Sequence, residues 1–298
     1  MAEITLLDGG MGQELIARSG SNPGPLWATR VMMDHPGLVK AIHADYFAAG
    51  ASLATTNTYN ILHDRLQPYG LDAFYHALHL RALAEAHEAR AEAGRGLIAG
   101  SMGPLRESYR PDLTPPIGES TALYTEKAAI LAPHVDLILI ETMSSLDLAR
   151  GALAGARTTG LPVWLSVSVD DRDGSRLRSG EPVSALAGVL AELPAQAVLA
   201  NCSMPEAMAA ALAALKPLGL PFGAYANGFS EISDLPLPEG DAVPGYCARH
   251  DLTPDRYTAF ALQWVEMGAT LVGGCCEVGP AHIRHLHAAL VAAGHRPR

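Results

Sequence analysis

Three of the four cysteines stand where they could share one metal ion. Cys275 and Cys276 are adjacent and follow Gly273-Gly274, while Cys202 lies far upstream. Three thiolates bind zinc at about 2.3 Å and leave the fourth tetrahedral position open, which is typical of a catalytic site. The spacing matches no zinc-finger pattern, so buried or redox-inert thiols remain the alternative interpretation.

The fourth cysteine, Cys247, is interpreted as a thiol that binds no metal, because it lies away from any predicted strand end and three cysteines already complete a site. Four cysteines are too few for a disulfide scaffold, and an adjacent pair has poor geometry for an ordinary disulfide. Residues Met1–Thr5 show no basic region and begin no long apolar run. We therefore expect no secretion signal and a reducing, cytoplasmic location.

Two carboxylates follow apolar runs and could bind a charged ligand. Glu141 comes directly after such a run, where a carboxylate must be paired or solvated, and this favours ligand binding. Asp8 precedes Gly9-Gly10, so it could either hold an ammonium group or form a turn. The backbone N–H groups of Gly9 and Gly10 stand near a short predicted helix and could receive a substrate carboxylate.

Several asparagines and tyrosines give weaker evidence for a ligand-binding site. The asparagines after predicted strands are Asn57, Asn201 and Asn227, and each is also a common turn residue. The tyrosines that could line a cage for a cation are Tyr59, Tyr225 and Tyr246, although packing is the favoured interpretation. The motif Gly-x-Gly-x-x-Gly is absent after the first predicted strand, so a dinucleotide fold has no support.

These residues converge only if the chain forms a suitable sheet. Short apolar runs without polar alternation are typical of parallel strands buried on both faces. Eight such runs occur, at Ile4–Leu7, Ala51–Thr55, Leu97–Ser101, Asp136–Ile140, Pro162–Ser168, Gln196–Ala200, Pro221–Tyr225 and Ala269–Gly273. Helical patterns occupy Gly12–Arg18, His35–Ala49, Leu71–Ala93, Glu119–Pro133, Leu146–Thr158, Val183–Leu193, Glu206–Leu215, Pro254–Met267 and Ala281–Ala293.

Eight strand–helix units predict a single-domain α/β protein, a (β/α)₈ TIM barrel spanning residues 1–298. A doubly wound open sheet is the alternative. In a barrel, the residues that follow the strands meet on one rim, so Cys202 can approach Cys275 and Cys276. The irregular stretches Ser19–Thr29, Pro104–Gly118, Val169–Glu181 and Phe229–Leu252 are interpreted as rim loops.

Composition narrows the class of partner. Apolar residues make up 49% of the 298, which is enough for a large core. The formal charge of −10, without clustered Lys or Arg, argues against nucleic acid as the main ligand. No apolar run approaches the ~18 residues that a membrane span needs. We therefore expect small-molecule ligands, and self-association into a homo-oligomer stays open.

Several motifs in this order resemble the homocysteine S-methyltransferase family, from Leu6 to about Leu286. The matching segments are Asp8-Gly9-Gly10-Met11-Gly12, Thr56-Asn57-Thr58-Tyr59, Gly100-Ser101-Met102-Gly103-Pro104, Glu141-Thr142, Asn201-Cys202 and Gly273-Gly274-Cys275-Cys276. The Gly-Gly-Cys-Cys ending with an upstream Asn-Cys is the most specific of these. The resemblance implies a (β/α)₈ barrel that catalyses methyl transfer to homocysteine.

The resemblance also implies roles for individual residues. Cys202, Cys275 and Cys276 would bind one zinc ion, and the homocysteine sulfur would be its fourth ligand. Glu141 would hold the substrate ammonium, Asp8 would line the same pocket, and Gly9-Gly10 would meet the substrate carboxylate. Asn57 and Asn201, which lie within matching motifs, are counted with them as substrate-binding residues. The products would be methionine and the demethylated donor.

The methyl donor is less well defined. The family often has Tyr-Pro-Asn where this chain has Tyr225-Ala226-Asn227, and the segment Leu105–Pro111 does not match the betaine branch. S-methylmethionine is the donor we expect first, with betaine or another onium compound as alternatives. Other hypotheses are a methyltransferase for another thiol or selenol such as selenocysteine, a non-catalytic zinc- or homocysteine-binding barrel, and a redox barrel with a Cys275–Cys276 disulfide.

Overall fold

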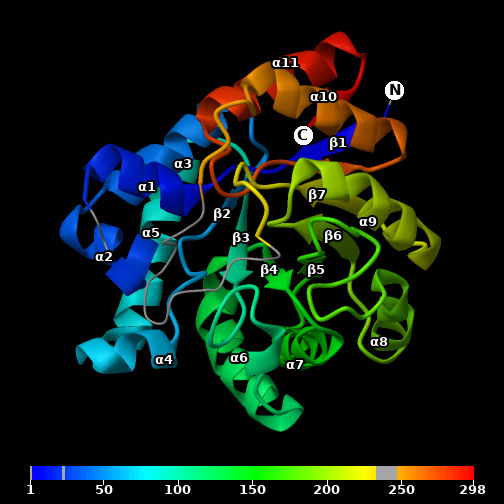
Figure 1. The fold of residues 1–298 in the computed structure, drawn as a ribbon. Helices are drawn as coiled ribbons and strands as arrows, with labels where there is room; N and C mark the ends of the chain where they lie inside the picture. The colour runs from blue at the N-terminus through cyan, green and yellow to red at the C-terminus, as the bar shows by residue number, and fades with distance from the viewer. Residues whose placement is uncertain (1, 22–23, 233–246) are drawn as a thin grey trace.

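The strands are mainly apolar because the sheet is covered by helices outside and filled by side chains inside. The computed structural model describes residues 2–21, 24–232 and 247–298. Its strands follow the eight predicted runs, and a ninth is added at the C-terminus (Figure 1). They are β1 (Glu3–Leu6), β2 (Leu53–Thr55), β3 (Leu97–Met102), β4 (Leu137–Met143), β5 (Val163–Val167), β6 (Ala197–Asn201), β7 (Phe222–Tyr225), β8 (Leu271–Val272) and β9 (Arg296–Pro297).

Helices connect successive strands and cover the outside of the sheet (Figure 1). They are α1 (Met11–Ser19), α2 (Trp27–Asp34), α3 (Leu38–Ala49), α4 (His63–Leu66), α5 (Tyr75–Ala93), α6 (Ile117–Leu131), α7 (Leu146–Ala156), α8 (Leu186–Glu192), α9 (Met208–Leu215), α10 (Pro254–Glu266) and α11 (Pro280–Ala292). Sequence signals explain several starts: the side chains of Ser145 and Thr253 cap α7 and α10 by accepting backbone N–H groups. The short helices α2 and α4 and the two-residue β9 were not predicted.

All strand pairs are parallel, in the order β2-β3-β4-β5-β6-β7-β8-β1-β9. The order of eight strand–helix units confirms a sheet like that of a TIM barrel, whereas the prediction of a closed barrel is wrong. In the described chain no ladder joins β1 to β2, and one backbone bond, from Ser52 N to Leu6 O at 2.7 Å, spans the gap. Strand β2 has only three residues, and its Thr55 N–H bonds the Asp8 carboxylate instead of a strand carbonyl.

The inside of the curled sheet has its own apolar cluster. It contains Leu7, Leu53, Ala99, Leu137, Leu139, Ala197, Leu199, Tyr225 and Leu271. Because strand side chains alternate between faces, the residue two positions beyond each inward side chain also points inward. Leu137 and Leu139 are thus followed by Glu141, and Ala197 and Leu199 by Asn201. The inward column therefore changes from apolar to polar at the carboxyl ends of the strands.

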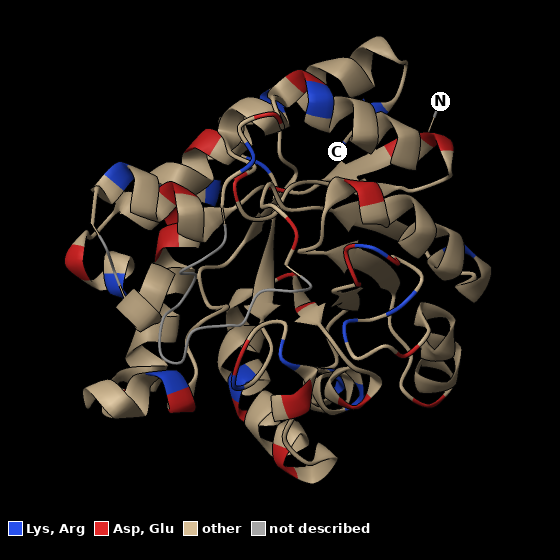
Figure 2. Cartoon of the chain, viewed as in Figure 1, with Lys and Arg blue, Asp and Glu red and all other residues tan. Residues whose placement is uncertain are grey.

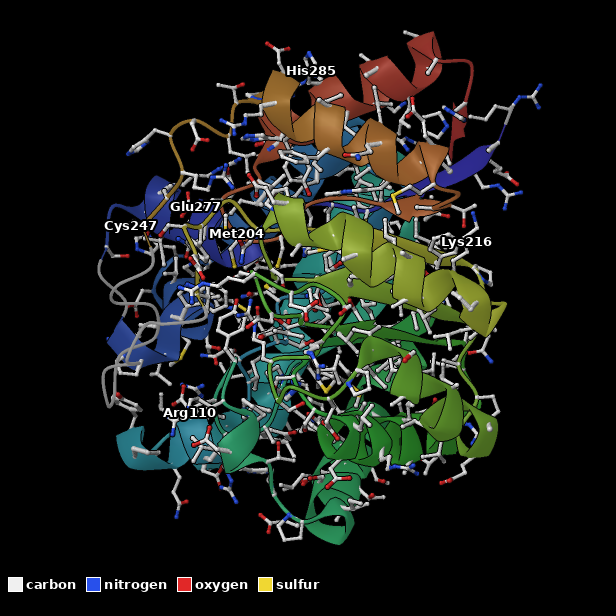
Figure 3. All side chains as sticks on the ribbon, turned by 45° about the vertical axis from the view of Figure 1, so that its right-hand side comes forward. Arg110, Met204, Lys216, Cys247, Glu277 and His285 are labelled. Atoms are coloured by element: carbon white, nitrogen blue, oxygen red, sulfur yellow. The ribbon has the colours of Figure 1, made fainter. Side chains whose placement is uncertain are left out.

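Charged side chains lie mostly on the outer helices and loops, while the strands carry few (Figure 2). The side-chain view separates the two ends of the sheet (Figure 3): Met204, Cys247 and Glu277 lie on one side and Lys216 on the other. This agrees with the chain order, since Met204 follows β6 and Lys216 precedes β7. Among the described helices, none is long and apolar enough to span a membrane.

Candidate active site at the carboxyl ends of the strands

Glu141 ends the inward column of β4 and is buried with two hydroxyl partners. Ser101 Oγ donates to its Oε1 at 2.5 Å, and Tyr225 OH donates to its Oε2 at 3.1 Å. Burial raises the pKa of Glu141 to about 8, and these hydrogen bonds only partly oppose that effect. A carboxyl group in this state is poised to ionise when a cation arrives beside it.

Asp8 lies just beyond β1 and is also buried. Its Oδ2 accepts the Thr55 backbone N–H at 2.6 Å and its Oδ1 accepts the Thr55 hydroxyl at 2.7 Å. Burial raises the pKa of Asp8 to about 7 despite these bonds. The Asp8 side chain thus ties the segment after β1 to β2, and its charge is near enough to Glu141 to help raise the pKa of that carboxyl group.

The structure brings together the three cysteines that the sequence singled out. The sulfur atoms of Cys202, Cys275 and Cys276 all lie within 4.8 Å of one another, so one ion could contact all three. Cys202 Sγ and Cys275 Sγ are 2.6 Å apart. Three sulfurs about 2.3 Å from a tetrahedral ion stand roughly 3.8 Å apart, so this pair must separate when an ion binds.

The three thiols share charge unequally. Hydrogen bonds from Cys275 and Cys276 hold the pKa of Cys202 well below its usual range, and Tyr109 and Thr142 add smaller contributions. The same bonds to Cys202 raise the pKa values of Cys275 and Cys276. Binding a cation among the three sulfurs would favour the ionised form of each thiol. This donor set suits a soft or borderline-soft divalent ion.

Backbone strain is concentrated around this group. Cys202 itself has φ +51°, Thr142 directly after Glu141 has φ +63°, and Glu277 directly after Cys276 has φ +63°. Side chains other than glycine rarely adopt this left-handed region, because Cβ approaches a neighbouring carbonyl. Such conformations persist where surrounding contacts fix them, and they cluster at functional sites.

The Cys275–Cys276 turn is held by backbone hydrogen bonds from two neighbouring loops. Cys275 N donates to Ala226 O at 2.9 Å, and Gly228 N donates to Cys276 O at 2.8 Å. On the other side, Gly274 N donates to Asp8 O at 2.9 Å. The turn is thus fixed between the segments that follow β7 and β1, and the Asp8 backbone supports it while the Asp8 side chain faces Thr55.

Gly9 and Gly10 are required for space rather than for an unusual backbone angle. A Cβ on Gly9 would lie 2.0 Å from Val278 O, and a Cβ on Gly10 would lie 2.7 Å from Cys275 O. Gly10 N donates to Val278 O at 3.0 Å, so that N–H is already used inside the protein. The expectation that Gly10 N–H receives a substrate carboxylate therefore meets a competing partner.

The predicted asparagines serve mainly to connect elements. Asn201 Oδ1 accepts Thr142 N at 2.9 Å and Ser166 Oγ at 2.8 Å, which ties β6 to β4 and β5. Asn57 Nδ2 donates to Ala28 O at 3.4 Å, so its side chain faces α2. Asn227 is fully buried and its Oδ1 accepts Phe229 N at 3.2 Å.

The fourth cysteine and the tyrosines named as cage candidates differ in their surroundings. Cys247 is exposed and is not part of the group of three sulfurs. Tyr225 contacts Glu141 rather than forming part of an open cage, and Tyr59 OH shares a 2.9 Å hydrogen bond with Ser108 Oγ. Tyr246 lies outside the described residues.

Sequence reasoning missed the side chains that support the site. Ser101 and Thr55 hold the two carboxylates, and strand alternation could have found both, since each stands two positions beyond an inward apolar residue. Arg178 and Asp171 lie in the loop after β5 and contact the Cys202 segment. No periodicity extends into such a loop, so this pair could not be predicted from the sequence.

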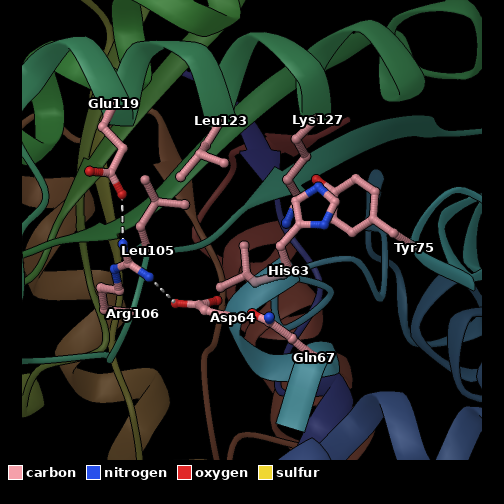
Figure 4. A pocket seen from close by; sticks show the side chains of 10 residues that line it. His63, Asp64, Gln67, Tyr75, Leu105, Arg106, Glu119, Leu123 and Lys127 are labelled. Carbon is pink, nitrogen blue, oxygen red and sulfur yellow. Dashed lines mark hydrogen bonds and ion pairs between the residues drawn. The ribbon is translucent and has the colours of Figure 1, made fainter. Parts of the chain in front are cut away.

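A separate cavity of about 160 Å³ lies beside α4 and α6 (Figure 4). His63, Arg106, Glu119 and Lys127 are among its lining residues. Its polar groups are largely paired with protein: Arg106 bonds Glu119 at 2.6 Å, and Lys127 Nζ donates to Thr58 O at 2.6 Å. Lys127 thereby supports the loop after β2, and the cavity does not contain the sulfur group.

Comparison with known proteins places this site among related enzymes. The family model for homocysteine S-methyltransferase matches residues 5–290. The chain is 32% identical over 305 residues to the homocysteine S-methyltransferase of Escherichia coli (strain K12), covering 96% of this chain and 95% of that protein. It is 27% identical over 328 residues to the selenocysteine methyltransferase of Astragalus bisulcatus, covering 98% and 94%. The crystal structure of the homocysteine methyltransferase MmuM from Escherichia coli in its metallated form superposes with a TM-score of 0.79 at 29% identity, covering 96% of each chain.

Proposed function

Because the chain belongs to the homocysteine S-methyltransferase family and is an S-methyltransferase, we propose that it methylates the thiol of homocysteine and produces methionine. The methyl donor is a small onium compound, with S-methylmethionine first and betaine or another donor as alternatives. The observation that carries the proposal is the group of three sulfurs at the same carboxyl ends of the strands as two buried carboxyl groups. A thiol amino acid has a sulfur that could approach the three cysteine sulfurs and an ammonium group that could pair with the two carboxyl groups.

Zinc is the ion proposed for the sulfur group formed by Cys202, Cys275 and Cys276. The three sulfurs would hold a single ion once the close Cys202–Cys275 pair separates, and they would leave room for a substrate sulfur. When bound there, zinc lowers the pKa of a coordinating thiol, so that a thiolate exists near neutral pH. The formal charge of three thiolates and Zn²⁺ is −1, which keeps the substrate sulfur electron-rich.

Glu141 and Asp8 are proposed to receive the substrate ammonium. Their raised pKa values, about 8 and about 7, mean that the free protein holds protons on one or both at neutral pH. A bound ammonium favours the ionised carboxylates, so substrate binding releases a proton. Ser101 and Tyr225 then fix the Glu141 oxygens and thereby orient the amino acid relative to the sulfurs.

The substrate carboxylate is proposed to meet the Gly9-Gly10 segment. Since Gly10 N–H already bonds Val278 O, the groups that remain are Gly9 and the first N–H groups of α1, which have no partner within their helix. Asn57 and Asn201 are proposed to act on the substrate only indirectly, by fixing the loops after β2 and β6.

Methyl transfer then needs alignment more than acid–base catalysis. The homocysteine thiolate attacks the donor methyl group in line, a carbon–sulfur bond forms, and the bond from the methyl carbon to the onium centre breaks. The donor is positively charged and leaves neutral, so no general acid is required. The barrier is lowered by the ionised nucleophile and by holding both substrates in the correct orientation.

A donor panel tests this proposal most directly. Zinc-replete protein is mixed with homocysteine and either S-methylmethionine, betaine or another onium donor, and methionine is measured. We expect turnover with S-methylmethionine. If zinc-replete protein forms no methionine with any donor, the proposed reaction is wrong, and a non-catalytic binding role takes its place.

Selenocysteine is the second acceptor to test, because one relative of this chain is a selenocysteine methyltransferase. Selenocysteine and homocysteine are compared side by side with the same donor. A higher kcat/KM for homocysteine supports the first proposal, and the reverse order would move the function to the selenol. The proposed zinc chemistry is the same for both acceptors.

A further inference from the structure

Arg178 is a buried cation directly beside the metal-binding segment. It lies in the loop between β5 and α8, and its side chain is 5% exposed, while that of its ion-pair partner Asp171 is 0% exposed. The closest atoms of the pair, Arg178 Nη2 and Asp171 Oδ1, are 3.3 Å apart. Removing two charges from water is costly, so a buried pair is weak evidence for stability and needs another explanation.

The guanidinium group is directed at the backbone of Cys202. Arg178 Nη2 donates to Cys202 O at 3.2 Å, and Arg178 Nε donates to Ser168 Oγ at 2.7 Å. Ser168 Oγ also lies 3.2 Å from Cys202 O. The Cys202 carbonyl thus has two side-chain donors, both from the end of β5 and its loop.

Asp171 extends the same connection to two further loops. Its Oδ1 accepts Met204 N at 2.7 Å, and its Oδ2 accepts Ile232 N at 2.8 Å. On the other side, the Arg178 guanidinium lies 4.8 Å from the centre of the Tyr109 ring, in the loop after β3. The pair therefore joins the loops after β3, β5, β6 and β7 at one point beside Cys202.

The conformation of Cys202 explains what such a connection does. Its φ of +51° is unfavourable for a residue with a side chain, so surrounding contacts must fix it. We propose that Arg178 and Asp171 are positioning residues that hold the Cys202 backbone so that its sulfur faces Cys275 and Cys276. This inference rests on the metal site of the proposed function, but not on the identity of the acceptor or donor.

The test compares zinc affinity with stability. Arg178→Met removes the donors to Cys202 O and keeps an apolar stem of similar length. We expect its zinc affinity, measured by competition with a chromogenic chelator, to fall about 10–100-fold, the range found for outer partners of metal ligands. We also expect a changed thiolate-to-cobalt charge-transfer band after cobalt substitution.

Arg150→Met is the matched control, because Arg150 pairs with Glu192 on the exposed surface between α7 and α8. It should leave zinc affinity and the cobalt spectrum unchanged. Ser168→Ala is the milder second variant: it keeps the ion pair and removes one donor to Cys202 O, so a fall of several-fold in affinity is expected. It tests the proposal even if Arg178→Met does not fold.

The outcomes separate the possible failures. If Arg178→Met or Ser168→Ala lowers the melting temperature but keeps wild-type zinc affinity and cobalt spectrum, the pair only stabilises loops and the proposal is wrong. If the wild type binds zinc but does not methylate homocysteine, the proposed function fails while this positioning role is still measured. If the wild type binds no stoichiometric zinc, both proposals fail.

Discussion

The sulfur group is assembled from two segments that are held in different ways. Cys202 directly follows β6 in a strained conformation, and its carbonyl is fixed by the side chains of Arg178 and Ser168. The Cys275–Cys276 turn is fixed by backbone bonds to the loops after β1 and β7 and by glycines packed against it. The first segment thus depends on side chains from a neighbouring loop, and the second depends on close backbone packing.

Because they are held differently, the two segments should respond differently to substitution. Side-chain donors can be removed one at a time, so the Cys202 segment should respond gradually to substitution. Backbone packing leaves no space for an added methyl group, so the turn should respond abruptly. Both segments contribute ligands to the same proposed ion, and loss of a ligand should be equally damaging on either side.

The largest expected effect comes from removing a ligand on either segment. Cys202→Ala and Cys276→Ala should each lower zinc affinity by more than about 100-fold, beyond the effect of losing an outer partner. Methyl transfer should be lost in both. Metal content after dialysis and methionine formation measure this. Full zinc content in Cys276→Ala would mean that the turn supplies only Cys275, and methyl transfer by zinc-free Cys202→Ala would refute the role of the ion.

The next effect concerns Glu141, which is tied to the Cys202 segment because Asn201 accepts the N–H of Thr142. Its pKa rises from 4.5 to about 8 on burial, so between these pH values the folded protein binds more protons than the unfolded chain. The free energy of unfolding of the metal-free protein should therefore fall as pH rises from about 5 to 8. In Glu141→Gln this contribution, roughly a few kcal/mol, should be absent.

Urea denaturation at several pH values measures the Glu141 effect. The remaining slope in Glu141→Gln reports Asp8, whose pKa of about 7 acts in the same direction. Equal slopes in wild type and variant would show that Glu141 does not hold a proton in this range. The variant should also raise the KM for homocysteine, because the proposed ammonium partner is neutral.

A smaller effect is expected from filling the space between the turn and the β1 loop. Gly10 has an ordinary φ of −71°, but an added Cβ would meet Cys275 O at 2.7 Å and Cys276 Cα at 3.0 Å. Gly10→Ala should destabilise the protein by about 1–3 kcal/mol and release zinc faster. Gly188→Ala is the matched control: its Cβ would meet nothing within 4 Å on exposed α8, and it should stabilise by about 0.5–1 kcal/mol.

The result for Gly10 distinguishes steric from conformational reasons for glycine. If Gly10→Ala behaves like Gly188→Ala in both unfolding and zinc release, the turn is not fixed by packing and the comparison of the two segments is wrong. If Gly10→Ala is destabilised but keeps its zinc, the β1 loop supports the fold and not the turn. Chelator-induced zinc release and urea denaturation on the same samples give both values.

The sequence predicted the parts of the site that follow strands. Buried strands produce continuous apolar runs, so the position after each run could be recognised, and this placed Cys202, Glu141 and the Cys275–Cys276 turn on one rim. The strand of Glu141 is longer than its apolar run, since β4 continues to Met143. Prediction failed for contacts between segments far apart in the sequence, because the local pattern of apolar residues does not report them. No ladder joins β1 to β2 in the described chain, because the Asp8 side chain just beyond β1 replaces a backbone partner of Thr55 in β2. The apolar periodicity of the sequence cannot show such a side-chain contact.

The supporting residues show the same limit. Thr55 and Ser101 continue an alternation and could have been found, whereas Arg178 reaches Cys202 from an irregular loop. The predicted rim loop Ser19–Thr29 overlaps the first residues of α2, which runs from Trp27 to Asp34. A residue's type and its neighbours along the chain predict where it stands on a strand, but not which loop will contact it.

The smallest expected effect concerns the strain at Glu277, directly after the turn. Its φ of +63° is comparable to that of Cys202, but Glu277 is not a proposed ligand, and its side chain accepts a 2.5 Å bond from Gln13 Nε2. Glu277→Gly relieves the strain, loses that bond and adds freedom to the unfolded chain. The net change in the free energy of unfolding should therefore stay within about 1 kcal/mol. Zinc content and the cobalt spectrum should match those of the wild type, because backbone bonds fix the turn. Loss of zinc in Glu277→Gly would show that strain at its exit positions the turn, and the two segments would then be held in the same way.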